Sequence, residues 1–349
     1  MSKSPDTESQ KLEISIKGES GRTYIFDKIL GRGTFGVVYE AHAKDNKELK
    51  FAVKRYFRTF HPNCAQLEIS IIFYLNKKIK DHNNPIVKLH DGFLDKKTGN
   101  LYMITSFLPH KKFTEYYKDL SIEIVKIYMK NLLTSLKLIH NEGIIHRDIK
   151  PDNFLFDLET KKSCLIDFGL AEADMDSSNW ENSNKDFQLD EDYKIISDLQ
   201  KHNYRHRTGT KGFLAPEIIF HSKFQSTSVD IRSAGVILLS FLSKRFPIFN
   251  LNVFNKISED IIKEIEPLII VFGRKKILDI ADKCGCHIYI SECFDNYQIG
   301  IDTLIKWKGQ NDYEKKYIKL AIDLCKKMLE IDYSKRISAV DALKHEFFN

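Results

Sequence analysis

The sequence predicts an α+β protein in which a small β-rich N-terminal lobe precedes a larger helical lobe, with a cleft between them. Apolar residues recur at every second position at Tyr24 and Phe26 and again at Leu49, Phe51 and Val53, as in strands. From Ile124 to Ile139 they recur every three or four residues, which gives one apolar face of a helix. Residues 229–243 are apolar nearly all round, so we expect a buried helix there.

The elements follow one another in a simple order. Residues 1–21 are rich in Ser, Lys and Glu and predict a flexible tail. Strand patterns fill residues 22–108, interrupted by a helix near Cys64–Leu75, and the helical lobe occupies residues 109–349. Two stretches stand out as inserts, a polar one near residues 173–206 and a poorly patterned one at 251–312. Inserted loops of such length are commonly functional or disordered.

Composition excludes several protein classes. Of 349 residues, 42% are hydrophobic and 29% charged, and the net charge of +6 is spread along the chain, whereas nucleic-acid binders concentrate basic charge on one face. The longest apolar stretch, Ala234–Leu242, is far shorter than the ~20 residues of a membrane span. No apolar leader opens the chain, and six cysteines in this length predict no disulfide framework. We therefore expect a soluble intracellular protein that binds neither nucleic acid nor membranes.

A glycine-rich segment at residues 30–38 reads LGRGTFGVV, a G-x-G-x-x-G-x-V pattern. Glycines let backbone amides approach phosphate oxygens without hindrance from a Cβ atom. A plain glycine-rich hairpin is the simpler alternative, and a dinucleotide site would need a helix next. A second strand follows instead, in which Ala52 and Lys54 share the face opposite Phe51 and Val53. We therefore expect Ala52 beside an adenine ring and Lys54 on the phosphates.

The most specific signal is residues 146–153, HRDIKPDN. Phosphoryl transfer needs an acceptor hydroxyl aligned with the phosphate, and charge neutralised by metal. Asp148 can orient that hydroxyl and accept its proton, while Lys150 can neutralise charge on the moving group. Asn153 can hold a magnesium ion, and we expect His146 to serve in packing.

Asp167-Phe168-Gly169 follows a short strand at residues 164–166, nineteen positions after Asp148. Carboxylate oxygens suit magnesium, so Asp167 is the second predicted ligand. The triplet alone would be an ordinary turn. With the lysine and the catalytic loop it predicts a transferase that uses ATP and Mg²⁺.

In order and context these segments resemble the eukaryotic protein kinase signature set, over roughly residues 22–349. The resemblance implies a bilobal kinase fold in which Glu68 pairs with Lys54, Glu217 pairs with Arg336, and Asp230 holds the catalytic-loop backbone. It places in catalysis Asp148, Lys150, Lys54, Glu68 and Thr210, and on the metal Asn153 and Asp167. It places around the nucleotide Leu30, Gly31, Arg32, Gly33, Thr34, Phe35, Gly36, Val38, Ala52, Lys54, Thr105, Ser106, Leu108 and Leu155. Thr105 would be the gatekeeper, and backbone groups of Ser106 and Leu108 would bind the adenine edge.

Finer features narrow the family. Lys150 together with Thr210 is the serine/threonine form of the motif. The segments 59–62, 107–113, 153–156 and 209–217 resemble the cell division control seven-type kinases, and both inserts fall where that family has them. Leu214, where the family usually has Arg, and Arg232, where most kinases have Trp, depart from the pattern.

The resemblance implies a nuclear enzyme of the cell cycle that phosphorylates Ser/Thr in replicative helicase subunits and depends on a regulatory subunit ordering the Glu68 helix. It also implies an acidic sequence context, with Lys211 as a contact for an acidic or phosphorylated neighbour of the acceptor. Another cell-cycle or casein-kinase-like enzyme is the alternative. A pseudokinase scaffold is disfavoured because Lys54, Asp148 and both metal ligands are present.

Two local questions stay open at this level. Arg147 could clamp a phosphate on the loop 170–214, with Thr208 as one acceptor, since Arg grips phosphate in bidentate fashion; equally, the inserted loop could do that job without phosphate. Cys284, Cys286, His287 and Cys293 could form a zinc cluster, but the spacing misses the usual Cys-x₂-Cys pairs, which favours structural cysteines.

Overall fold

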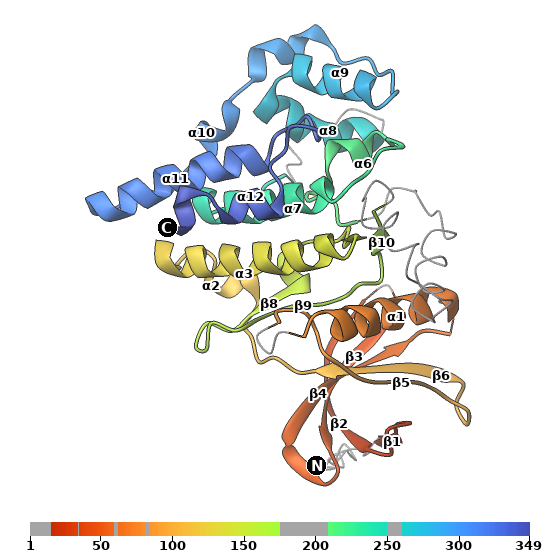
Figure 1. Ribbon diagram of the computed structural model, residues 1–349. Coiled ribbons are helices and arrows are strands. Elements are labelled where there is room, and N and C mark those ends of the chain that lie inside the picture. Colours follow the sequence, from red (N-terminus) through yellow and green to blue (C-terminus); the bar gives the residue numbers. More distant parts are fainter. Residues whose placement is uncertain (1–14, 34, 59–61, 81–83, 175–208, 250–259) are drawn as a thin grey trace, which may run out of the picture. The chain divides into compact units, whose positions relative to one another are not determined.

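The computed structural model describes residues 15–33, 35–58, 62–80, 84–174, 209–249 and 260–349 (Figure 1). The chain divides into two compact units. Unit 1 comprises Met1–Ile72 and Val87–Phe107, and unit 2 comprises Phe73–Ile86 and Leu108–Asn349. Within the parts of the chain that the structure describes, no helix combines the length and apolarity needed to cross a membrane.

Unit 1 is built on one antiparallel sheet with the strand order β1-β2-β3-β4-β6-β5. The helix α1 (Pro62–Lys78) enters between the fourth and fifth strands of the sequence, as the pattern near Cys64–Leu75 predicts. The strands are β1 (Ser15–Lys17), β2 (Thr23–Arg32), β3 (Gly36–Ala43), β4 (Asn46–Tyr56), β5 (Leu89–Asp95) and β6 (Asn100–Ser106).

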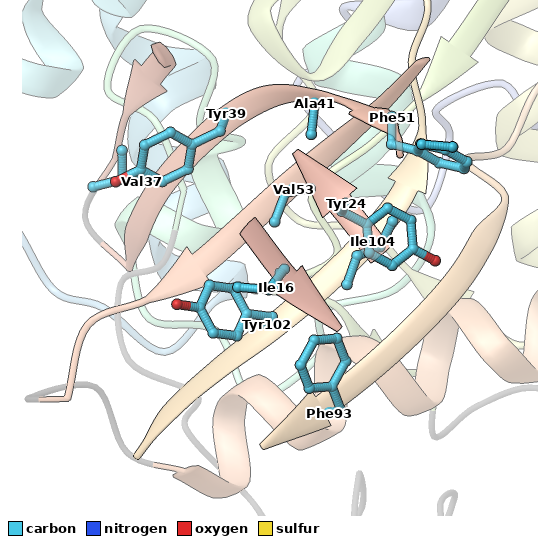
Figure 2. Close-up of a cluster of buried hydrophobic side chains, with 11 residues drawn as sticks. Ile16, Tyr24, Val37, Tyr39, Ala41, Phe51, Val53, Phe93, Tyr102 and Ile104 are labelled. Atoms are coloured by element: carbon cyan, nitrogen blue, oxygen red, sulfur yellow. The ribbon is translucent and has the colours of Figure 1, made fainter. Parts of the chain in front are cut away.

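The core of unit 1 lies on one face of this sheet (Figure 2). The register sets Val53 of β4 opposite Tyr39 of β3 and Ile104 of β6, so alternate residues of adjacent strands meet on the same face. Phe51 packs edge-to-face on Tyr24, with ring centroids 5.1 Å apart. Burial of alternate positions on this face leaves Ala52 and Lys54 on the other face, as the sequence pattern predicts.

The predicted flexible tail is too long. Residues 15–17 form β1, which pairs with β2 in the register Ile16↔Tyr24, and Ile16 joins the core. Leu12, Ile14 and Ile16 alternate with polar residues, but this run is short and lies in a polar segment, so the strand was not predicted. Residues 1–14 lie outside the described part of the chain.

Unit 2 is mostly helical, with two short antiparallel strand pairs, β7 with β10 and β8 with β9, on either side of the catalytic loop in sequence. Its strands are β7 (Ile144–Ile145), β8 (Phe154–Phe156), β9 (Ser163–Leu165) and β10 (Glu172–Ala173). Its helices up to the C-terminal third are α2 (Phe113–Tyr116), α3 (Ile122–Asn141), η1 (Pro151–Asn153), α6 (Pro216–Ile219) and α7 (Ser228–Ser243). Those that follow are α8 (Asp260–Phe272), α9 (Arg274–Lys283), η2 (Glu292–Tyr297), α10 (Gly300–Leu304), α11 (Asp312–Met328), α12 (Ala339–Leu343) and η3 (Glu346–Phe348).

The buried helix α7 is the centre of unit 2. It lies against α3 (Figure 1), where the ring of Phe241 meets Tyr128 at 5.1 Å. Against α11 the approach is closer still, because a Cβ atom on Gly235 would come within 2.9 Å of Leu329 and 3.0 Å of Met328. Glycine at this position therefore lets the two segments pack in direct contact.

Much of the second insert is ordered into helices. The stretch 251–312, whose sequence shows no clear pattern, contains α8, α9, η2 and α10, while residues 250–259 lie outside the described part. The apolar residues of α8 are nearly continuous, and Ile265, Leu268 and Ile269 are all buried. A helix buried on several sides lacks the alternation that a surface helix shows, which explains why it was missed. The first insert falls almost entirely within residues 175–208, outside the described part.

Two fully buried arginines of unit 2 differ in their partners. Arg336 donates to both carboxylate oxygens of Glu217, at 2.6 and 3.1 Å, as the kinase resemblance implies. Arg232 of α7 is equally buried, but Nε and both Nη atoms have no hydrogen-bond partner among the described residues. Its guanidinium lies 5.5 and 5.2 Å from the ring centroids of Phe249 and Phe272. Burial, with a smaller contribution from the charge of Arg336, lowers the pKa of Arg232 to about 9.

We predict that Arg232→Met stabilises the protein, whereas Arg336→Met destabilises it. Replacing buried ionic groups by apolar ones of similar volume is neutral or stabilising by about 1–4 kcal/mol, and removing one partner of a buried pair costs about 3–5 kcal/mol. Thermal and denaturant unfolding of the two variants measure this difference. Equal destabilisation by both would contradict it.

The effect of Arg232→Met on the free energy of unfolding should depend on pH. Because the folded-state pKa of Arg232 is lowered, the unfolded state binds more protons than the folded state above about pH 9. Wild-type stability therefore gains from rising pH in that range, and the advantage of Arg232→Met should shrink there.

Candidate active site

The glycine-rich segment forms the end of β2, a tight turn and the start of β3. Gly31 pairs with Val38, and the Gly33 N–H donates to the Gly36 carbonyl at 3.0 Å. At Gly36 a Cβ atom would lie 2.3 Å from the Arg55 carbonyl oxygen, so the fold itself requires glycine there. Thr34 lies outside the described residues.

At Gly31 and Gly33, the other two glycines of the pattern, no contact within the protein requires glycine. A Cβ atom added at Gly31 or Gly33 meets no atom within 4 Å, and neither residue has a positive φ. Their backbone therefore borders space that a side chain would partly fill. That is the arrangement expected where main-chain amides must approach a ligand closely.

Lys54 of β4 is held by α1. Its Nζ lies 2.8 Å from both carboxylate oxygens of Glu68, whose side chain is fully buried. Tyr56 donates a further hydrogen bond to Glu68 at 3.0 Å, and its ring lies beneath the lysine ammonium at 5.1 Å. These contacts fix one positive charge on the sheet face opposite the core. The Lys54–Glu68 pair implied by the resemblance is present.

The predicted adenine-binding residues lie on two strands, β4 and β6, and on the segment after β6. Thr105 pairs with Ala52 in the sheet, is buried, and donates to the Ala52 carbonyl at 3.4 Å. The Ser106 N–H already donates to the Lys88 carbonyl, so only its carbonyl can serve a ligand. In unit 2, the Leu108 carbonyl bonds to His110, which leaves the Leu108 N–H for that purpose.

The remaining predicted nucleotide residues show varied exposure. Leu30 and Arg32 are exposed at the end of β2. Val38 and Ala52 are half-buried on the sheet face opposite the core of unit 1, and Leu155 is half-buried on β8. The ring of Phe35 lies 5.9 Å from the Lys54 ammonium.

The catalytic loop of unit 2 brings three predicted residues into mutual contact. Lys150 Nζ lies 2.7 Å from Asp148 Oδ2 and 2.8 Å from Thr210 Oγ1. The Thr210 hydroxyl donates to Asp148 Oδ1 at 2.6 Å, which closes the triangle. Each oxygen of the Asp148 carboxylate is thus oriented by a separate donor.

Of the two predicted metal ligands, Asn153 belongs to the catalytic loop and Asp167 lies fourteen positions further along the chain. The Asn153 amide nitrogen donates to the Asp148 carbonyl at 2.8 Å and to Oδ2 at 3.0 Å. Within the described part of the chain no hydrogen bond engages its amide oxygen, which is a hard oxygen of the kind magnesium prefers. Asp167 is half-buried and follows β9 with a left-handed φ of 63°. Non-glycine residues in this region are uncommon and cluster at functional sites.

The loop backbone is anchored by Asp230, buried near the start of α7. Its Oδ2 accepts the His146 N–H and its Oδ1 accepts the Arg147 N–H, each at 2.8 Å, and His140 Nε2 lies 2.9 Å from Oδ2. Burial alone would raise the pKa of Asp230, but the hydrogen bond and charge of His140, with those of His146, outweigh it and lower the pKa. The carboxylate is therefore ionised where the loop needs it.

His146 serves packing, as expected. Its ring is fully buried and lies against Phe168 at 4.9 Å. The ring Nε2 donates to the Ile166 carbonyl at 3.0 Å, and Nδ1 accepts the Asp148 N–H at 3.3 Å. The imidazole thus links the backbone of the catalytic loop to the segment that leads into Asp167.

Comparisons with known proteins agree with this geometry. Residues 24–348 match the model of the protein kinase domain family. The chain belongs to the protein kinase family. It is 32% identical over 348 residues to the cell cycle serine/threonine-protein kinase hsk1 of Schizosaccharomyces pombe, covering 93% of this chain and 66% of that protein, slightly under two thirds.

Two further relatives point the same way. The cell cycle protein kinase spo4 of the same yeast is 31% identical, over 85% of this chain and 73% of its own length. The probable cell division control protein 7 homolog 2 of Encephalitozoon cuniculi is 28% identical, over 92% of this chain and 90% of its own length. The predicted kinase fold and the resemblance to the cell division control seven-type are confirmed.

Several residues of the kinase site were not found from the sequence. Tyr56 and His140 bond the two buried carboxylates from distant segments, and Glu172 with Gln225 bond the guanidinium of Arg147. None belongs to a recognisable motif, since each acts only through its place in the fold. The alternation of β4 could have indicated Tyr56, which shares a face with Ala52 and Lys54.

The cysteine-rich stretch gives no metal site. All six cysteines are free, and among the described residues no three His, Cys, Asp or Glu side chains converge as a metal ion would require. Burial raises the pKa of the Cys284 thiol to about 11, so it stays protonated at neutral pH. The alternative of a zinc cluster therefore finds no support within the described part of this kinase.

Proposed function

We propose that this chain is an active serine/threonine protein kinase that transfers the γ-phosphoryl group of ATP to protein hydroxyl groups in the cell cycle. The observation that carries the proposal is the contact among Asp148, Lys150 and Thr210, with Asn153 bonded to the same carboxylate. The Lys54–Glu68 pair on unit 1 supplies the second required element. Together these are the groups that phosphoryl transfer needs.

Each side chain has a definite task in the proposed reaction. Asp148 orients the acceptor hydroxyl and takes its proton as the new oxygen–phosphorus bond forms. Lys150 offsets charge on the transferred group, and Thr210 holds both in place by its two hydrogen bonds. Lys54 binds phosphate oxygens, and the buried Glu68 keeps its ammonium from turning away.

The donor atoms also fit the metal that kinases use. Asn153 and Asp167 provide an amide oxygen and a carboxylate, both hard oxygen ligands suited to Mg²⁺. Magnesium, when bound, neutralises phosphate charge that develops during transfer. The glycines at positions 31 and 33 leave room for phosphates beside the backbone of β2.

We predict that Asp148→Asn lowers kcat by roughly 10²–10⁴-fold, the usual contribution of a general base, because an amide cannot accept the proton. Nucleotide affinity should change little, since Lys54 and the glycine segment are untouched. Steady-state transfer to a Ser/Thr peptide and nucleotide titration measure the two effects. Asp152→Asn, an exposed change in the same loop, is the matched control. Wild-type turnover by Asp148→Asn would overturn the mechanism.

The biological setting is proposed from the relatives. hsk1 and spo4 are named as cell cycle kinases, and the Encephalitozoon proteins as probable cell division control protein 7 homologs. We therefore place this chain in the nucleus, in the initiation of DNA replication, with replicative helicase subunits as substrates.

An acidic sequence context is proposed from the surroundings of Lys211. This residue follows Thr210 directly, and its side chain is 76% exposed. Its Nζ lies 3.3 Å from Glu264 of α8, whose side chain is only 12% exposed. An acidic or phosphorylated residue beside the acceptor would thus meet an ammonium already paired with a carboxylate. Leu214, at the family's arginine position, is buried and adds no positive charge.

We predict that Lys211→Glu abolishes the preference for an acidic neighbour, measured as the kcat/KM ratio of peptides with Asp or Ala beside the acceptor serine. Glu264→Gln should raise the same ratio, because the ammonium loses a competing carboxylate. Lys344→Glu, a charge reversal at another exposed and paired lysine, should leave it unchanged. A preference that survives Lys211→Glu refutes this contact.

We also propose that a regulatory subunit increases turnover. The resemblance and the long inserts support this, although the Lys54–Glu68 pair already forms within the chain itself. The expected result is weak transfer by the purified single chain and strong transfer after a partner isolated from the source is added. Full activity of the chain alone would contradict the requirement.

A further inference from the structure

The guanidinium of Arg147 is the least exposed positive charge beside the catalytic carboxylate. Arg147 directly precedes Asp148, its side chain is 2% exposed, and its backbone has a left-handed φ of 67°. The Arg147 N–H donates to Asp230. The backbone conformation of Arg147 therefore determines the position and direction of the chain as it enters Asp148. Burying a guanidinium to this degree costs free energy, and a fixed anion beside it offsets that cost.

That anion is Glu172. One Nη atom of Arg147 contacts the Glu172 carboxylate, and the other donates to the Gln225 amide oxygen at 2.5 Å. Gln225 cannot turn its amide freely, because its nitrogen donates to the Ser222 carbonyl at 3.1 Å. The guanidinium thus lies between a charged and a neutral acceptor, both with fixed orientation.

The position of Glu172 is fixed by backbone pairing between two strands. It lies on β10, which pairs with β7 in the register Glu172↔Ile145 and Ala173↔Ile144, and the Asp174 N–H donates to the Gly143 carbonyl at 2.7 Å. β7 leads directly into His146 and Arg147. The anion and the arginine are therefore fixed on two paired strands of unit 2.

We infer that Glu172 is a positioning residue, whose carboxylate occupies the place on Arg147 that an attached phosphate could take and so makes phosphorylation of the chain unnecessary for transfer. A phosphate would add two negative charges beside Glu172, and the like charges would repel. The inference rests on the proposed kinase function. It answers the question that the sequence leaves open at Arg147, and Thr208 lies outside the described residues.

The test uses the full chain, with its activating partner if one is required. The protein is treated with phosphatase, repurified, and shown by intact mass to carry no phosphate. The inference predicts that kcat of the dephosphorylated wild type stays within about twofold of the untreated value. Glu172→Gln should lower kcat at least tenfold, with KM for ATP and melting temperature little changed, because only the charge is removed.

Three further variants separate positioning from a merely structural role. Glu172→Asp keeps the charge and should retain more activity than Glu172→Gln. Glu172→Ala should be partly rescued by formate or acetate, but not by chloride at equal ionic strength, since the site is 23% exposed and selects a carboxylate. Glu159→Gln, an exposed glutamate of the same unit, is the matched control with unchanged kcat.

The outcomes are distinguishable. Loss of activity on phosphatase treatment, or wild-type kcat in Glu172→Gln, overturns this inference alone. Equal losses in Glu172→Gln and Glu172→Asp, with lower melting temperatures and no rescue by carboxylates, make the residue structural and also overturn it. Absence of transfer by the untreated wild type overturns the proposed function as well.

Discussion

The catalytic half of this protein depends on one buried carboxylate. Asp230 accepts the N–H groups of His146 and Arg147 on separate oxygens, and both bonds are 2.8 Å long. Buried backbone donors without partners cost roughly 1–3 kcal/mol each, so the loop can follow this path only while the carboxylate is present. The helix α7 that carries Asp230 is itself buried and packs against α3 and α11. The loop is therefore bonded to a helix that other helices hold in place.

Several charged groups take their places from that anchor. The left-handed turn at Arg147 directs its guanidinium to Glu172 and Gln225 and starts the segment that presents Asp148 to Lys150 and Thr210. Asp148 and Glu172 each contact a positive side chain, which offsets part of the cost of removing a charge from water. Unit 1 follows the same rule, for example at Glu68, whose buried carboxylate bonds Lys54 and Tyr56.

The sequence predicted the parts whose chemistry dictates residue type at fixed spacing. The glycine segment, Lys54, the catalytic loop and Asp167 were found in this way, and the alternation of β4 placed Lys54 on the correct face. Partners contributed by distant segments, such as Glu172 for Arg147, have no local signal, because one glutamate in a loop could serve many purposes. Backbone conformation was equally hidden, because neither Arg147 nor Asp167 is a glycine, the residue type that most readily takes a positive φ. The packing around α7 was not predicted either. An arginine at position 232 does not by itself indicate that two phenylalanine rings lie beside it.

Amide hydrogen exchange at His146 and Arg147 in the Asp230→Asn variant tests most directly whether this carboxylate holds the catalytic loop. Asparagine can accept only one of the two N–H groups, because its amide nitrogen would face the other donor. The wild-type amides should be among the slowest to exchange in unit 2, and at least one should exchange tenfold faster or more in the variant, with a parallel fall in kcat. Unchanged protection of both amides would contradict the account.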